Sequence, residues 1–181
     1  MKFKTLLIFL FFSILLFVGC DSKDENKKSA SSNKNTKVFT LNTLDDSSIK
    51  ISLEDDKILL EGSNEKLVLL NFFTTWCPAC KVEIANLVRL QESFQNDLVV
   101  VGILLEDFKT NDEIKEFMGK FGTNYKVTNS NEAFELAKSL GGLKAVPTLF
   151  LLDKNGEIFQ KYTGLVPNEM MEVDIKKLLE R

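Results

Sequence analysis

Two continuous apolar runs of strand length constrain the fold of this chain most strongly. They are residues 67–73 (LVLLNFF) and residues 98–105 (LVVVGILL). A strand with one face in water alternates apolar and polar side chains, whereas a strand that helices cover on both faces is apolar throughout. Both runs are therefore predicted to be central strands of a sheet that is at least partly parallel.

Helical and strand patterns alternate along the rest of the chain. The segments with helical spacing of apolar residues are 77–95, 110–121, 132–140 and the C-terminus from Pro167 onward. The shorter predicted strands are 38–44, 49–53, 125–128, 148–152 and 157–162. A Ser/Thr-x-x-Glu capping box at residues 110–113 opens the second helix. This alternation, closed by a hairpin and a helix, indicates an α/β sandwich.

The N-terminus has the pattern of a secretory signal peptide. Lys2 and Lys4 precede a nearly continuous apolar stretch at residues 6–18, and a glycine and a cysteine follow it. The stretch is shorter than the roughly 20 apolar residues that a membrane-spanning helix needs. Residues 1–19 are therefore predicted to be a signal peptide, and the domain is expected to work outside the cytoplasm.

Residues 17–20 (FVGC) resemble the lipobox of bacterial lipoproteins, in which the signal is cut before a cysteine that then carries lipid, although Phe17 stands where leucine is usual. The resemblance implies a lipid anchor on Cys20 and attachment to a membrane, at the periplasmic face of the inner membrane if the source is Gram-negative. The alternative is an ordinary secretory signal, or an uncleaved anchor, with an incidental Cys20.

The segment after Cys20 is predicted to be a flexible tether. From Asp21 to Lys37 no residue is more apolar than Ala30, so this segment cannot bury enough surface to order itself. We therefore divide the mature chain into a lipidated cysteine with its tether at residues 20–37 and one folded domain at residues 38–181.

The charge balance argues against a nucleic-acid partner. The chain has 23 Lys and Arg residues against 26 Asp and Glu residues, a net charge of −3, with both signs interspersed. Binding of nucleic acid needs clustered positive charge that neutralises phosphates, whereas interspersed charges form a solvated surface. We expect no nucleic-acid partner, and we expect the domain to act as a monomer.

Two cysteines, Cys77 and Cys80, lie where the first buried strand gives way to a helix. At this position the Cys77 sulfur is expected to meet unpaired backbone N–H groups and the positive end of the helix dipole, which stabilise the reactive thiolate. Cys80 is one turn further along the same helix face, where its sulfur can bond to that of Cys77 without a backbone shift.

Such a pair could be a metal site, a structural disulfide or a redox couple. A zinc site needs two more ligands, yet the chain has no histidine and its third cysteine, Cys20, is expected to carry lipid. A structural disulfide between Cys77 and Cys80 would close too small a loop to restrain the unfolded chain much. We therefore favour a redox couple, and expect no metal and no cofactor other than the Cys77–Cys80 disulfide.

Residues 71–80 (NFFTTWCPAC) resemble the active-site segment of the thioredoxin superfamily, and residues 145–149 (AVPTL) resemble its cis-proline loop. Within that superfamily, residues 75–78 (TWCP), Glu83 and the added strand and helix at residues 98–140 are similar to the TlpA/ResA-type membrane-tethered reductases. The resemblance implies a three-layer α/β/α sandwich with a central mixed sheet, an N-terminal β-hairpin and an inserted strand–helix unit.

The resemblance also implies roles for residues around the two thiols. Pro147 would be cis and would pack beside the sulfurs, keeping metals away and exposing the Val146 backbone to an extended substrate. Pro78, between the cysteines, would support the active site. Trp76 would cover its rim, the alternative being a core aromatic. Because most X-Pro bonds are trans, the cis form of Pro147 rests on the resemblance alone.

The sequence leaves the proton acceptor for Cys80 open. Thioredoxin carries a buried aspartate at the position of Asn71, where a carboxylate helps to deprotonate the inner cysteine, and Asn71 cannot take a proton. Glu83, one turn beyond Cys80, is the nearest candidate for that task. The alternative for Glu83 is an exposed helix carboxylate without a catalytic role.

Three functions are compatible with these features. The first is a membrane-tethered thiol:disulfide oxidoreductase that keeps protein cysteines reduced outside the cytoplasm, as in cytochrome c maturation, and takes electrons from a membrane partner because that compartment is oxidising. The second is an oxidase or isomerase that donates disulfides to protein dithiols. The third is a non-catalytic lipoprotein that uses the fold for binding. The residues between the cysteines do not distinguish the first from the second.

Overall fold

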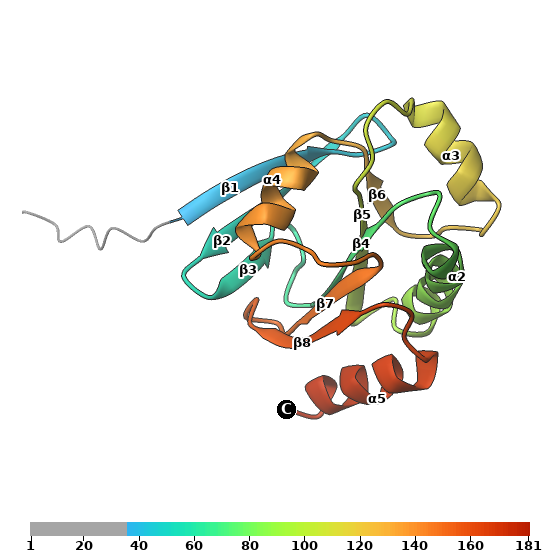
Figure 1. Ribbon diagram of the computed structural model, residues 1–181. Coiled ribbons are helices and arrows are strands. Elements are labelled where there is room, and N and C mark those ends of the chain that lie inside the picture. The colour runs from blue at the N-terminus through green and yellow to red at the C-terminus, as the bar shows by residue number, and fades with distance from the viewer. Residues whose placement is uncertain (1–35) are drawn as a thin grey trace, which may run out of the picture. The chain divides into compact units, whose positions relative to one another are not determined.

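The computed structural model describes residues 36–181, whose secondary structure consists of two β-sheets and four helices (Figure 1). The predicted signal peptide, Cys20 and most of the predicted tether lie outside the described residues. The larger sheet has five strands in the order β6-β5-β4-β7-β8, and the smaller sheet has three in the order β1-β2-β3.

The centre of the larger sheet is formed by β4 (Leu67–Phe73) and β5 (Leu98–Leu104), which run parallel. All seven residues of β4 are buried, as its apolar sequence predicts. β6 (Lys126–Thr128) extends the parallel half, whereas β7 (Thr148–Leu152) and β8 (Ile158–Thr163) are antiparallel. The sheet is therefore mixed, as predicted, and the carboxyl ends of β4 and β5 meet at one edge.

Helices cover both faces of this sheet. Apolar side chains of α2 (Pro78–Ser93) and α5 (Asn168–Leu179) pack with β4 on one face, and α3 (Asn111–Gly119) joins them near the end of β4. The other face packs against α4 (Glu132–Ser139) and the smaller sheet. The predicted helices are confirmed, with ends that differ by at most two residues. None of the helices in residues 36–181 is long and apolar enough to cross a membrane.

Local sequence signals explain where these helices begin and end. Thr110 Oγ1 accepts the N–H of Glu113 at 3.3 Å, and the Glu113 carboxylate accepts the N–H of Thr110 at 2.8 Å, so the predicted capping box is confirmed. Gly141 and Gly142 follow α4 with φ of 86° and 75°, which is the left-handed region where a side chain would be unfavourable.

The smaller sheet has one more strand than the predicted hairpin. β1 (Thr36–Asn42) pairs with β2 (Ser48–Glu54), and β2 pairs in turn with β3 (Lys57–Leu60), both antiparallel. The prediction missed β3 because it has only four residues and follows a tight turn at Asp55, whose φ is 53°. A run this short carries little periodicity.

Thr36 and Lys37, the last two residues of the predicted tether, belong to β1. They pair with Glu54 and Leu53 of β2. The Lys37 ammonium also donates to Ser139 Oγ at 2.7 Å in α4. The tether prediction was wrong at these two positions, because pairing with a neighbouring strand orders polar residues that local composition alone would leave unfolded.

Gly156, in the turn between β7 and β8, joins the two sheets. Its carbonyl accepts the N–H of Ile58 in β3 at 2.8 Å, and its φ is 80°. A Cβ at this position would lie 2.6 Å from the Ile58 carbonyl oxygen. Only glycine therefore allows the turn to approach β3 so closely.

Replacement of Gly156 by Ala is expected to destabilise the domain more than the same change at Gly62. Gly62 also has a positive φ, 78°, but no atom lies within 4 Å of its Cβ position. Gly62→Ala should lower the free energy of unfolding by about 1–2 kcal/mol, because alanine is unfavourable in the left-handed region. Gly156→Ala should lower it by about 1–3 kcal/mol more, because β3 must move away. Urea denaturation measures both free energies, and equal losses would contradict the close approach of Gly156 to β3.

Candidate active site

Cys77 is the N-cap residue of α2, directly after the turn that follows β4. Its backbone is extended (φ −77°, ψ 118°), and its Sγ accepts the N–H of Cys80 at 3.1 Å, with Pro78 in the first turn of the helix. Both cysteines are free thiols; Cys77 is 5% exposed and Cys80 fully buried. An N-cap side chain satisfies an otherwise unpaired helix N–H. The outer sulfur thus receives a hydrogen bond that would stabilise negative charge on it.

The loop before β7 lies against the Cys77 sulfur. The Val146–Pro147 peptide bond is cis, as the resemblance implies, and the Cys77 thiol donates to the Val146 carbonyl at 3.5 Å. Thr148 Oγ1 donates to the carbonyl of Ala145 at 2.7 Å and so fixes the start of the strand. The fold therefore brings together Cys77, Val146 and Pro147, which are far apart in the sequence.

Cys80 is held as a neutral thiol. The pKa of Cys80 is raised to about 12, mainly by burial and next by the side-chain hydrogen bond with Cys77. A hydrogen bond from the Thr74 backbone opposes the shift. Charged groups lose hydration when they are buried, so the thiolate of Cys80 is disfavoured. Cys80 can act as a nucleophile only if a nearby group takes its proton.

Glu83 is fully buried in α2, one helical turn beyond Cys80, so the alternative of an exposed carboxylate is wrong. Its Oε2 accepts the N–H of Val166 at 3.0 Å, while its Oε1 has no hydrogen-bond partner in the described residues. Burial raises the pKa of Glu83 to about 7, against the opposing effect of the Val166 hydrogen bond. A carboxyl group with this pKa can exchange a proton near neutral pH.

Further buried polar groups lie beneath α2 without partners. Asn71 sits in the middle of β4, between Gly102 of β5 and Leu149 of β7, and neither its side-chain oxygen nor its nitrogen has a partner in residues 36–181. The Tyr125 hydroxyl is likewise buried and unpaired; burial, and then the charge of Glu83, raise its pKa. Sequence reasoning missed Tyr125, because no local pattern places its hydroxyl near α2. Such groups are rare in native interiors.

Trp76 lies on the surface beside the thiols. Its side chain is 67% exposed, so the alternative of a core aromatic is wrong. The preceding residue, Thr75, donates from its N–H and its Oγ1 to the two oxygens of Glu106, each at 3.1 Å. Sequence reasoning also missed Glu106, which follows β5 and ties the β5–α3 connection to the turn that carries Trp76.

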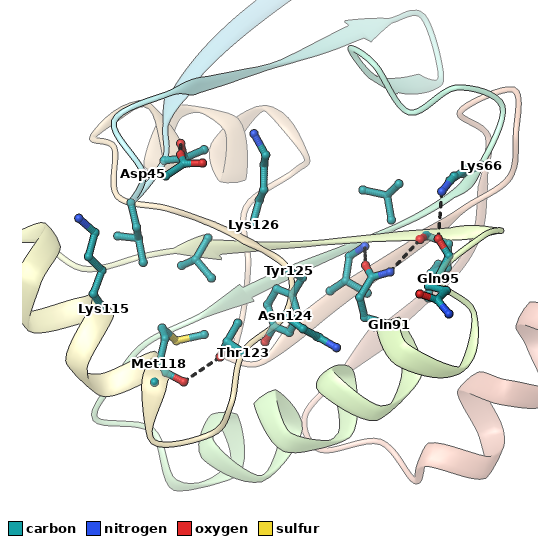
Figure 2. Close-up of a pocket in the computed structure, with 17 residues that line it drawn as sticks. Asp45, Lys66, Gln91, Gln95, Lys115, Met118, Thr123, Asn124, Tyr125 and Lys126 are labelled. Atoms are coloured by element: carbon teal, nitrogen blue, oxygen red, sulfur yellow. Dashed lines mark hydrogen bonds between the residues drawn. The ribbon is translucent and has the colours of Figure 1, made fainter.

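One hollow on the domain is separate from these residues. It has a volume of about 610 Å³ and lies along the edge of β5 beyond the short β6, with Lys66, Gln91, Lys126 and Tyr125 among its lining residues (Figure 2). Gln91 donates to the carbonyl of Leu98 at 3.1 Å and accepts the N–H of Val100 at 2.8 Å. The Gln91 amide thus pairs with backbone groups of β5 that have no neighbouring strand at this edge. The hollow follows from the shortness of β6 and contains neither cysteine.

A metal centre finds no support in the described part of the chain. Across residues 36–181, no three His, Cys, Asp or Glu side chains gather where they could hold an ion. The fold, with a pair of thiols at the start of α2, is thioredoxin-like.

The family follows from comparison with known proteins. Residues 33–179 match the Redoxin family, so the chain belongs to that family. "Thiol-disulfide oxidoreductase ResA" of Bacillus thuringiensis is 31% identical over 126 residues, which cover 70% of this chain and 71% of the relative. "Thiol:disulfide interchange protein DsbE" of Pseudomonas aeruginosa is 28% identical over 174 residues, covering 96% of this chain and 89% of the relative.

Solved structures share the fold. A thioredoxin-family thiol:disulfide interchange protein from Chlorobium tepidum aligns with a TM-score of 0.64 at 24% identity, covering 78% of this chain and 93% of that structure. StoA from Bacillus subtilis aligns with a TM-score of 0.59 at 21% identity, covering 76% and 96%. These alignments support the thioredoxin-like arrangement of sheet and helices.

Replacement of Glu83 by Gln tests the buried carboxyl group. The pKa of Glu83 rises from 4.5 to about 7 on folding, so the folded state binds the proton more tightly. The contribution of Glu83 to stability is therefore full below pH 4.5 and falls by up to about 3 kcal/mol as pH rises through 7. Gln carries no charge to desolvate and can still accept the Val166 N–H, so Glu83→Gln should lose this dependence.

Urea denaturation of the reduced protein at pH 5 and pH 8 measures the effect. The matched control is Glu92→Gln, which removes an exposed carboxylate from the same helix and should follow the wild type. If Glu83→Gln also follows the wild type, Glu83 is not buried as an ionisable group.

Proposed function

We propose that this protein is an extracytoplasmic thiol:disulfide oxidoreductase that reduces disulfides of substrate proteins with the dithiol Cys77/Cys80. The arrangement of the two thiols carries the proposal: the outer sulfur receives a helix N–H and borders the cis-Pro147 loop, while the inner thiol is fully buried. This asymmetry suits Cys77 to attack a substrate and Cys80 to release it. The names of the ResA and DsbE relatives support the same chemistry.

The first step forms a mixed disulfide. The thiolate of Cys77 attacks one sulfur of the substrate disulfide, so a bond forms between Cys77 and that sulfur and the substrate S–S bond breaks. The other substrate sulfur leaves as a thiolate and takes a proton from water. An extended substrate would lie along the backbone of Val146, which borders the Cys77 sulfur.

The second step releases the substrate. The Cys80 sulfur attacks Cys77, the Cys77–Cys80 disulfide forms, and the remaining substrate sulfur leaves as a thiolate, so two electrons have passed from the dithiol to the substrate. Glu83 accepts the proton of Cys80. On its own this transfer is uphill, since the pKa is about 12 for Cys80 and about 7 for Glu83. The proton therefore leaves as the S–S bond forms, once the hydrogen bond with the Cys77 thiol is gone.

The proposed location is the outer face of a membrane. The signal peptide at residues 1–19 and the lipobox-like sequence that ends at Cys20 support secretion and lipid anchoring. A reductase in an oxidising compartment must be reduced again after each turnover. A membrane protein with its own dithiol would reduce the Cys77–Cys80 disulfide, and cysteines that must stay reduced for cytochrome c maturation are one class of substrate.

Two other functions make different predictions. A disulfide-donating oxidase or isomerase would run the same two steps in the opposite direction, which only the reduction potential distinguishes. A non-catalytic binding lipoprotein would keep its biological role after Cys77→Ser, whereas a reductase would lose it. The buried, unpaired Oε1 of Glu83, one helical turn from the buried Cys80, favours a catalytic role, because a binding domain gains nothing from a desolvated carboxyl group.

The reduction potential of the purified domain tests the proposed direction. Trp76 is the only tryptophan and precedes Cys77, so its fluorescence should report the redox state during titration with glutathione. A reductase should have a midpoint near that of thioredoxin, about −270 mV, whereas a strong oxidant lies near about −120 mV. A variant with serine at both Cys77 and Cys80 is the control and should show no change. A midpoint close to the second value would replace the reductase by an oxidase.

A further inference from the structure

Phe108 is an exposed aromatic side chain on a strained backbone. It lies in the connection between β5 and α3, its side chain is fully exposed (102%), and its φ is 72°. Bulky residues rarely adopt this left-handed conformation, which glycine adopts freely. Because the Phe108 side chain is exposed, packing inside the domain does not offset the cost of this conformation. A strained backbone next to an active site indicates a functional contact.

The connection that carries Phe108 is held at the active-site edge. Glu106, two residues earlier, binds the N–H and hydroxyl of Thr75, two residues before Cys77. Because β4 and β5 are parallel, the β4–α2 and β5–α3 connections leave the same edge of the sheet (Figure 1). Through this contact, the Cα atoms of Phe108 and Cys77 are at most about 24 Å apart, which a seven-residue extended peptide spans.

Two exposed aromatic residues thus flank the Thr75–Glu106 contact. Trp76 directly follows Thr75, and neither Trp76 nor Phe108 stacks on another ring in the described residues. The connection carries Glu106, Asp107 and Lys109, a net charge of only −1, and the Glu106 carboxylate is already bound to Thr75, so this part of the edge offers little charge to attract an ionic partner. The contact it offers is apolar, and aromatic side chains supply most of the binding energy in such contacts.

We propose that Phe108 is a specificity-determining residue that binds an apolar side chain of an extended substrate segment, within about seven residues of the cysteine that reacts with Cys77. The inference rests on the proposed function and names its substrate class: unfolded or locally extended protein segments with an aromatic or aliphatic residue near the disulfide. Trp76 contacts the substrate next to its cysteine, and Phe108 contacts it further away. Small hydrophilic disulfides have no apolar side chain for Phe108 to bind.

The test compares Phe108→Gly with the wild type on two kinds of disulfide. The peptide substrates carry one cysteine, as a disulfide with glutathione, and a phenylalanine placed two to seven residues from it; the matched peptide has serine instead. Phe108→Gly should lower kcat/KM about tenfold for the best phenylalanine peptide, a loss of about 1.4 kcal/mol. The rate with the serine peptide and with oxidised glutathione should stay within twofold, and Phe108→Leu should retain most of the phenylalanine preference.

Two controls separate binding from damage to the fold. Phe134, on α4, is 40% exposed on the opposite layer, so Phe134→Ser should leave both kinds of rate unchanged. Phe108→Gly should raise the urea midpoint, because glycine relieves the left-handed backbone. A variant that is more stable yet slower only on phenylalanine peptides supports a binding role. Equal rates for the wild type and Phe108→Gly on every peptide would overturn the binding role of Phe108. An equal fall in the rate of Phe108→Gly with oxidised glutathione would also overturn it.

A binding measurement keeps this inference distinct from the proposed function. The same peptides with serine in place of cysteine undergo no exchange, so fluorescence anisotropy reports binding alone. Phe108→Gly should weaken binding of the phenylalanine peptide about tenfold; unchanged binding would contradict the role of Phe108. Failure of the wild type to react with oxidised glutathione would instead refute the dithiol chemistry of Cys77 and Cys80.

Discussion

Burial of β4 on both faces is the constraint on which the rest of this structure depends. Because every residue of β4 is buried, the register of this strand in the sheet is fixed. The end of β4 in turn fixes where α2 begins. The N-cap position of α2 falls on Cys77, which therefore receives a helix N–H. Parallel pairing with β5 then brings Glu106 to Thr75, and antiparallel pairing with β7 brings the Val146 carbonyl, just before Pro147, to the sulfur. The site assembles from the ends of buried strands.

The same burial sets the proton chemistry. A thiol and a carboxyl group one helical turn apart, both without access to water, prefer their neutral forms, so each favours retention of its proton. Asn71 cannot relieve this situation, because an amide does not titrate. Glu83 is a buried ionisable group one helical turn from Cys80, and its unpaired Oε1 leaves it able to receive a proton. The desolvated carboxylate destabilises the fold near neutral pH, and in the proposed mechanism the same group takes the proton of the inner cysteine.

The sequence predicted the central sheet, the helices and the thiol pair, because these follow from patterns within a few residues. It missed β3, whose four residues carry no periodicity, and it left Glu83 undecided between a buried and an exposed position. Glu83 accepts a hydrogen bond from Val166, 83 residues away, and Glu106 accepts one from Thr75, 31 residues away. Contacts at such separations arise only when the sheet has formed, so no local sequence pattern predicts them.

Trapping of the mixed disulfide tests the central claim, that Cys77 attacks and Cys80 resolves. Each single serine variant is mixed with a disulfide-linked peptide and analysed by mass spectrometry without reductant. Cys80→Ser should accumulate one peptide on Cys77, since nothing resolves the bond, whereas Cys77→Ser should accumulate none because Cys80 is buried and protonated. An adduct on Cys80 in the Cys77→Ser variant, formed as fast as that on Cys77, would refute these roles of the two cysteines.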